Sequence, residues 1–434
     1  MMRRPLLRSS VVALLALAAC EGKDAHGVGP NGGSAFTKYI AVGTSISMGM
    51  QSAGVTATSQ VEAWPALLAR QAGATFQIPY LRTPGCTPPL IAPLQLGRLL
   101  SGASALAGDS TCSGTLGSYT PPLNNLALSG ATAWAALNLT PRLVTAPTST
   151  FSAADRGRYA AVLGTTQSQV TAMLIAAPTI VSVELGANEL LGAATSGLLI
   201  AATSYTQATP WTYVPATVFG PVYASIADSV KVSKARAILF TVPKVTNMVS
   251  MRAGSELAAD RAAFATFGIA VAASCDGSAN LVFTGSVVPA LVARAQLTGA
   301  LQTLSCDDVP GAADGVLTPA DVATLNGAAD QMNAQITALA KANGWAVVDM
   351  NTVLGTIVAA RPAYSVAAQL GCLNPYGQYI SLDGVHPSLA GQQLLANAAA
   401  QAVNATYGFA IPTQPVTPLP PAQVCLGGAT AASY

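Results

Sequence analysis

Short runs of aliphatic and β-branched residues alternate along this chain with longer alanine-rich stretches, and this alternation restricts the possible folds more than any other feature. Strands that alternate with helices form parallel sheets covered by helices. We therefore predict an α/β fold in which the four clearest runs are strands of one parallel sheet: Tyr39-Ile-Ala-Val42, Thr179-Ile-Val-Ser-Val183, Ala237-Ile-Leu-Phe-Thr-Val242 and Trp345-Ala-Val-Val348.

Cap signals predict two of the helices between and after these strands. Thr318-Pro-Ala-Asp321 combines a capping residue, a proline at the first helical position and an acid at the third, which predicts a helix over 319–343. Ser388 opens a second helical stretch over 389–402 in the same way. Residues 411–421 are too rich in proline to be helical, so we expect an extended strap there.

The first 19 residues have the pattern of a secretory leader, with a basic start and an apolar run over 11–19. That run is too short to span a bilayer, which takes about 20 apolar residues. Leu17-Ala-Ala-Cys20 resembles the lipobox of bacterial lipoproteins, which implies acylation of Cys20. We expect export and a lipid anchor at the outer membrane or periplasmic face; an ordinary cleaved signal with an incidental cysteine is the alternative.

Six cysteines remain when Cys20 is set aside, an even number that permits three disulfides in an oxidising compartment. Metal binding is disfavoured because no Cys-x-x-Cys spacing occurs and the only histidines are His26 and His386. Six cysteines allow 15 pairings. The pairing of sequential neighbours that we favour joins Cys86 with Cys112, Cys275 with Cys306, and Cys372 with Cys425.

Composition and chain length indicate one exported globular domain. Three of the 20 basic residues lie in the leader, which leaves 17 against 18 acidic ones, and nothing in this balance suggests a nucleic-acid partner. We predict a Gly-rich tether over 20–35, a domain over 36–410 and a Pro-rich C-terminal strap over 411–434. Large insertions into the domain are expected at about 84–125, 190–225 and 250–315.

Ser45 follows the first predicted strand, in Gly43-Thr-Ser45-Ile-Ser47. Reacting groups of open α/β sheets gather beyond the carboxyl ends of the strands, where free N–H groups at a helix start favour developing negative charge. Ser45 is therefore a candidate nucleophile. The alternative is that it merely caps the helix.

Asp383-Gly-Val-His386 supplies the only histidine outside the tether, with an acid three residues before it. A carboxylate that accepts from one ring nitrogen fixes the tautomer, so the other nitrogen can take the proton of a serine. Asp383 and His386 therefore complete a candidate triad with Ser45, although Asp-x-x-His alone is a weak signal.

Two further segments offer donors for an oxyanion. Gly186-Ala-Asn188 follows the second predicted strand and places a side-chain amide at the edge of the sheet that carries Ser45. Gly130, in Ser129-Gly-Ala-Thr132, lets the backbone approach a substrate and present its N–H group.

Together these four segments resemble the SGNH hydrolases, also called the GDSL esterase/lipase family, in the family's order. The resemblance implies a three-layer, flavodoxin-like α/β/α fold with a parallel sheet of about five strands. It also implies ester hydrolysis through an acyl-enzyme without a cofactor, with Ser45 as nucleophile, His386 as base and Asp383 as its orienting acid. The oxyanion hole would comprise the N–H groups of Ser45 and Gly130 and the side chain of Asn188.

The chain departs from the family pattern at two positions. Thr44 stands where the family has the aspartate of Gly-Asp-Ser, and Glu189 where it has the aspartate of Gly-x-Asn-Asp. A literal Gly108-Asp-Ser110 also occurs, but it follows a loop-like stretch rather than a strand, so we place the nucleophile at Ser45.

A carboxylic ester hydrolase is thus the leading functional hypothesis, acting on a small ester, a lipid or an acylated glycan. An O-acetyl glycan deacetylase is the rival within the same chemistry. The alternative from a different class is a non-catalytic surface lipoprotein that keeps the fold and binds a glycan or a protein partner.

Overall fold

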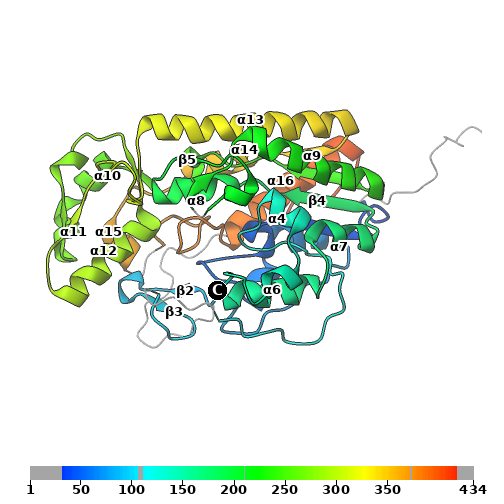
Figure 1. Ribbon diagram of the computed structural model, residues 1–434, viewed down its shortest axis with the longest axis horizontal. Coiled ribbons are helices and arrows are strands. Elements are labelled where there is room, and N and C mark those ends of the chain that lie inside the picture. The colour runs from blue at the N-terminus through cyan, green and yellow to red at the C-terminus, as the bar shows by residue number, and fades with distance from the viewer. Residues whose placement is uncertain (1–31, 106–110, 210, 372–373, 418–434) are drawn as a thin grey trace, which may run out of the picture.

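A four-stranded parallel sheet forms the centre of the computed structural model, which describes residues 32–105, 111–209, 211–371 and 374–417 (Figure 1). All three neighbouring pairs are parallel and follow the order of the chain. The four predicted runs are confirmed as its strands: β1 (Tyr39–Gly43), β4 (Ile180–Glu184), β7 (Arg236–Phe240) and β13 (Ala346–Val348).

The fifth strand expected from the family resemblance is reduced to a bridge beside β1. Ala41 donates to the carbonyl of Asn124 at 2.8 Å and accepts from the amide of Leu126 at 2.8 Å, in parallel orientation. The amide of Leu128 then reaches the carbonyl of Gly43 at 3.1 Å. With this segment beside β1 the spatial order is that of the flavodoxin-like sheet, 2-1-3-4-5, so the chain order reverses next to β1.

Alternate strand residues face two separate hydrophobic cores, which gives the three predicted layers. Tyr39 and Ala41 pack with α3, α14 and α16, whereas Ile40 and Val42 face the layer of α4, α7, α9 and α13. Those helices are α3 (Trp64–Gln71), α14 (Met350–Ala359) and α16 (Leu389–Tyr407) on one side, and α4 (Ala133–Asn138), α7 (Gln169–Ala176), α9 (Ala216–Ser233) and α13 (Pro319–Asn343) on the other.

Both helices predicted from cap signals are present. The side chain of Thr318 accepts from the amide of Asp321 in a capping box, and α13 has the predicted bounds. Ser388 caps α16, which runs five residues beyond the predicted end at 402 because no helix-breaking residue precedes Gly408. Gly408 ends the helix in the left-handed region, at φ 69°.

The described part of the Pro-rich strap, 411–417, lies along α16 in extended form. Side-chain amides of the helix replace the backbone partners that an isolated extended segment lacks. They meet the strap at every third residue: Asn404 bonds to Ile411, Asn397 to Gln414 and Gln393 to Thr417.

A small lobe with its own hydrophobic core occupies one end of the molecule, at the left of Figure 1. It includes most of the predicted insertion 250–315. Its main elements are α10 (Gly254–Ala259), α11 (Arg261–Thr266), β9 (Ile269–Val271), α12 (Thr284–Thr298), β11 (Gln302–Leu304) and α15 (Val366–Leu370).

The other two predicted insertions differ from each other in structure. Over 84–125 the regular elements are short, among them the hairpin of β2 (Leu90–Ile91) and β3 (Arg98–Leu99). The segment 190–225, by contrast, is about half helical, because most of α8 (Asn188–Ser196) and the first half of α9 fall inside it. Between these helices lie two short parallel strands, β5 (Ile200–Ala201) and β6 (Thr212–Tyr213).

Two of the three expected disulfides are formed, Cys86–Cys112 and Cys275–Cys306. Cys372 and Cys425 of the third pair, the lipidation candidate Cys20 and Ser110 lie outside the described residues. Among the helices of the described ranges, none is long and apolar enough to cross a membrane.

Candidate active site

The nucleophile candidate begins the short helix α1 (Ser45–Met48), directly after β1. Thr44 occupies the cap position and makes no side-chain cap bond, so the alternative that Ser45 is the helix cap is wrong. Gly43 is needed at the end of the strand, because a β-carbon there would lie 2.6 Å from Oγ of Ser47. Ser45 itself is only 6% exposed.

The structure brings Ser45, His386 and Asp383 into one hydrogen-bonded chain. Nε2 of His386 lies 2.9 Å from Oγ of Ser45, and its Nδ1 lies 2.7 Å from Oδ2 of Asp383. Because the carboxylate accepts from Nδ1, that nitrogen carries the proton and Nε2 is left to accept from the serine hydroxyl. All three side chains are buried.

Asp383 is held in its ionised form by the groups around it. Its Oδ1 accepts from the backbone amides of Val385 and His386, each at 2.9 Å, and its Oδ2 also accepts from the amide of Ala53 at 2.5 Å. Burial alone would raise the pKa of this carboxyl. The imidazole of His386 and the hydrogen bonds lower it by more, so the pKa lies below its ordinary value.

Asn188 lines the same pocket as Ser45 and His386. One N–H of its side chain donates to the carbonyl of Ala131 at 2.8 Å, which leaves the second N–H for another acceptor. Gly130 precedes Ala131 in the left-handed conformation, at φ 76°, which explains the glycine. Gly130 is not among the residues that line the pocket, so its predicted donor role remains a prediction.

The arrangement of these residues is the one that the resemblance to the SGNH hydrolases implies. The predicted nucleophile, base, acid and amide donor come from segments up to 341 residues apart in the chain, yet they meet at the carboxyl end of β1. The resemblance seen in the sequence therefore extends to the geometry of the site.

No protein-family model and no curated protein matches the chain. Among solved structures, a putative GDSL-like lipase from Parabacteroides merdae is 11% identical and aligns over 85% of this chain and 96% of its own, with a TM-score of 0.34. A GDSL-like lipase from Bacteroides thetaiotaomicron is 12% identical over 86% and 90%, with a TM-score of 0.31. A catalytic mutant of an acetylxylan esterase from Geobacillus stearothermophilus is 12% identical over 86% and 94%, with a TM-score of 0.34.

Thr44 replaces the aspartate that precedes the nucleophile in the family pattern, but a carboxylate still lies beside Ser45. Glu184 at the end of β4 supplies it. Its side chain accepts from the amide of Thr44 at 3.0 Å and from the hydroxyls of Thr44 and Ser47 at 2.8 and 2.9 Å. Burial raises the pKa of Glu184, although these donors oppose the shift. Sequence analysis missed this residue; a lone acid in an otherwise apolar strand was the available signal.

The departure at Glu189 places a second buried carboxyl behind the oxyanion donors. Oε1 accepts from the amide of Ala133 at 2.6 Å and from the hydroxyl of Tyr205 at 2.9 Å, so it ties α8 to the segment that follows Gly130. Oε2 has no hydrogen-bond partner among the described residues. Burial raises the pKa of Glu189 to about 7, with a smaller contribution from the charge of Glu184.

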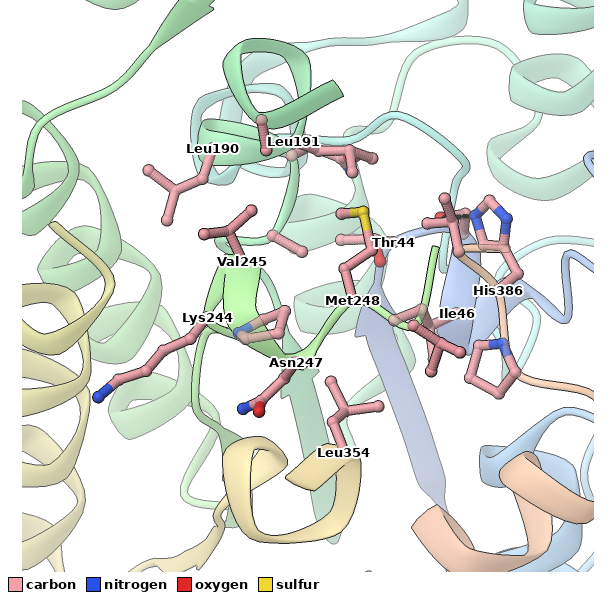
Figure 2. A pocket seen from close by; sticks show the side chains of 18 of the residues that line it. Thr44, Ile46, Leu190, Leu191, Lys244, Val245, Asn247, Met248, Leu354 and His386 are labelled. Atoms are coloured by element: carbon pink, nitrogen blue, oxygen red, sulfur yellow. Dashed lines mark hydrogen bonds between the residues drawn. The ribbon is translucent and has the colours of Figure 1, made fainter. Parts of the chain in front are cut away.

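An apolar pocket opens beside the triad, with a volume of about 770 Å³ that includes space open to solvent. Figure 2 shows Thr44, Ile46 and His386 on one side of it, and Leu190 and Leu191 on another. The remaining wall is mainly aliphatic and comes from five parts of the chain: Ala187, Ala194, Pro243, Val245, Met248, Val249, Leu325, Leu354, Ile380 and Val385.

The pocket lining contains one lysine and no arginine, and the charge of this residue, Lys244, is paired with that of Asp330. Figure 2 shows its side chain extending away from His386, and its Nζ lies 2.8 Å from Oδ1 of Asp330 on α13. Among the described residues, no group of three or more histidines, cysteines or acids is placed to hold a metal ion.

Proposed function

We propose that this protein is a carboxylic ester hydrolase that forms an acyl-enzyme on Ser45. The observation that carries the proposal is the continuous chain of hydrogen bonds from Asp383 through His386 to Ser45 at the edge of an apolar pocket. A serine hydroxyl is a weak nucleophile on its own, and a neighbouring base oriented by a carboxylate is the arrangement that activates it.

Acylation begins when Oγ of Ser45 attacks the ester carbonyl carbon while Nε2 of His386 takes the hydroxyl proton. The imidazolium that forms is stabilised by the ionised carboxylate of Asp383. When the tetrahedral intermediate collapses, the bond to the alcohol oxygen breaks and His386 returns the proton to that oxygen. Water then attacks the acyl-serine with His386 as base, which releases the acid and restores the hydroxyl of Ser45.

The negative charge of the intermediate needs donors that are in place before the reaction. The free N–H of Asn188 and the backbone amide of Ser45, at the start of α1, are the donors we assign. The amide of Gly130 is a third candidate, because the bond from Asn188 to Ala131 holds its segment against the site.

The aliphatic lining supports an ester with an extended apolar acyl chain as the substrate class. Each buried methylene group contributes about 0.8 kcal/mol of binding free energy, and an acetyl group would leave most of this pocket unused. The pocket therefore favours a lipase-like or medium-chain esterase over the O-acetyl glycan deacetylase. We also propose that the leader and Cys20 place the enzyme in the cell envelope, where acyl lipids are available.

Hydrolysis of p-nitrophenyl esters from acetate to decanoate by the purified mature protein tests this function. We expect turnover that rises with chain length beyond acetate and is lost in Ser45→Ala and His386→Ala. Ser110→Ala is the matched control and should retain full activity. Absence of turnover on every ester would contradict the proposal and favour the non-catalytic binding protein.

A further inference from the structure

A turn seven residues after the nucleophile contacts the loop that carries the acid and the base. Residues 51–54 form a two-residue turn in which Gln51 and Gly54 exchange both backbone hydrogen bonds, each at 2.9 Å. The amide of Met50, next to this turn, donates to the carbonyl of Ser45 at 2.9 Å. The turn is thus an extension of the nucleophile segment.

Both central residues of the turn have a backbone conformation that side chains disfavour. Ser52 has φ 52° and Ala53 has φ 62°, a combination that a tight turn ordinarily fills with asparagine, aspartate or glycine. Non-glycine residues held in this region cluster at active sites, where surrounding contacts maintain them. The contacts at this turn therefore point to its role.

Ser52 makes two hydrogen bonds to the loop that carries Asp383 and His386, one with Ser381 and one with Leu382. The amide of Ser52 donates to Oγ of Ser381 at 2.8 Å, and Oγ of Ser52 accepts from the amide of Leu382 at 3.3 Å. Both serines are buried, at 0% and 8% exposure, so water does not compete for these bonds.

Ser381 and Ala53, the neighbour of Ser52 in the turn, bond directly to the catalytic residues. Oγ of Ser381 lies 3.0 Å from the carbonyl of His386, to which it can donate, and the amide of Ala53 donates to Oδ2 of Asp383, the oxygen that accepts from the imidazole. The turn therefore fixes one end of the triad relative to the other.

We propose that Ser52, Ala53 and Ser381 are positioning residues, which hold the acid and base loop at bonding distance from Ser45. The proposal rests on the proposed ester hydrolysis for its kinetic consequence, but not for its structural one. The strained turn places a backbone amide at Asp383, and the bonds of Ser52 to Ser381 and Leu382 maintain that placement. Neither serine contacts the pocket, so their loss should change the chemical step rather than substrate binding.

The kinetic test compares Ser381→Ala, Ser52→Ala and the double variant on one p-nitrophenyl ester. We expect kcat to fall roughly 10-fold in Ser381→Ala and about 3-fold in Ser52→Ala, with KM within about 2-fold. Because both hydroxyls join the same two segments, the double variant should lose less than the product of the single losses.

Ser233→Ala is the matched control. Like the two test serines, Ser233 bonds to the backbone: its hydroxyl donates to the carbonyl of Val230 and accepts from the amide of Ala235. It lies between α9 and β7, at the amino end of that strand, whereas the triad lies at the carboxyl end of β1. Its loss should lower the unfolding temperature without changing kcat.

A second measurement does not depend on turnover. The proton on Nδ1 of His386, which is hydrogen-bonded to the carboxylate of Asp383, should give a far-downfield NMR resonance. The chain has only two histidines, so a resonance that persists in His26→Gln can be assigned to His386. The resonance should move or broaden in Ser381→Ala and in Ser52→Ala, and stay unchanged in Ser233→Ala. Unchanged kcat and an unchanged resonance in both serine variants would overturn the proposal. If the protein cleaves no ester, the proposed function fails, and the resonance still decides this inference.

Discussion

The two walls of the pocket are stabilised in different ways. On the polar wall, Ser45, His386 and Asn188 each have a hydrogen-bond partner that fixes the side chain. On the apolar wall, residues such as Leu190 and Leu354 are held by packing alone, on helices from separate parts of the chain. We infer from this difference that the chemical step depends on a few hydrogen bonds of fixed geometry. Substrate choice depends instead on the volume of the pocket that the helices enclose.

The strongest way to break this comparison is to remove a reacting group from the polar wall. We expect Ser45→Ala and His386→Ala each to lower kcat by about 10⁴-fold or more, because the two groups act as one unit. Thermal unfolding should change little in Ser45→Ala, whereas His386→Ala should also lower the unfolding temperature, because the buried carboxylate of Asp383 loses its imidazole partner. Ester hydrolysis and a melting curve of each variant check this; substantial activity in either one would contradict the triad.

The amide donor on the same wall should have a smaller effect. Asn188→Asp keeps the shape of the side chain but replaces its donors with acceptors, so we expect kcat to fall about 100-fold to 1,000-fold with little change in KM. Steady-state kinetics on the preferred ester measures both. A loss confined to KM would show that Asn188 binds the substrate rather than the transition state.

The apolar wall should respond in selectivity rather than in rate. Leu354→Trp narrows the pocket, and we expect the ratio of kcat/KM for decanoate over acetate esters to fall about 10-fold or more, with acetate turnover largely retained. Ala359→Trp, on an exposed turn at the end of the same helix, is the control. An unchanged ratio would mean that the acyl chain lies elsewhere.

The smallest effect on turnover is expected from Glu189, the carboxyl that bonds to the segment after Gly130, and its main effect is on stability. The pKa of Glu189 rises from 4.5 to about 7 on folding, so its contribution to stability is fully present below pH 4.5 and is lost as the pH rises through about 7. The loss is on the order of 3 kcal/mol. Glu189→Gln should flatten the decline in unfolding free energy between pH 5 and 8.

Urea unfolding across that pH range measures the Glu189 effect. Part of the decline should remain in the variant, because burial also raises the pKa of Glu184 and shifts stability with the same sign. An identical pH dependence in both proteins would mean that Glu189 does not titrate as its burial implies.

Local signals in the sequence predicted much of the fold. The strand runs and the capping box at Thr318 are patterns of neighbouring residues. They predict strands and a helix without knowledge of which distant segments pack against them. The site residues could be predicted because a single usable histidine left few combinations. Ser45 and Asn188 were placed together by the rule that the carboxyl ends of parallel strands share an edge, and the triad argument then joined His386 to Ser45.

The parts that were not predicted depend on contacts between distant segments. An acid such as Glu184 in a buried strand has no explanation in the sequence alone. Its role depends on Thr44 and Ser47, which donate hydrogen bonds to it in the folded protein. The partnership of Ser52 with Ser381 carries no local pattern, because serine is common and the two are 329 residues apart. The same holds for the apolar wall, whose residues share no spacing and become a pocket only after α8, α13 and α14 have packed.

The central claim, that Ser45 is an activated nucleophile, can be tested most directly with a fluorophosphonate probe followed by peptide mapping. Only an activated serine reacts with such a probe. We predict a single adduct on the peptide that contains Ser45, absent in Ser45→Ala and strongly slowed in His386→Ala. No adduct, or an adduct on the peptide that contains Ser110, would contradict the account.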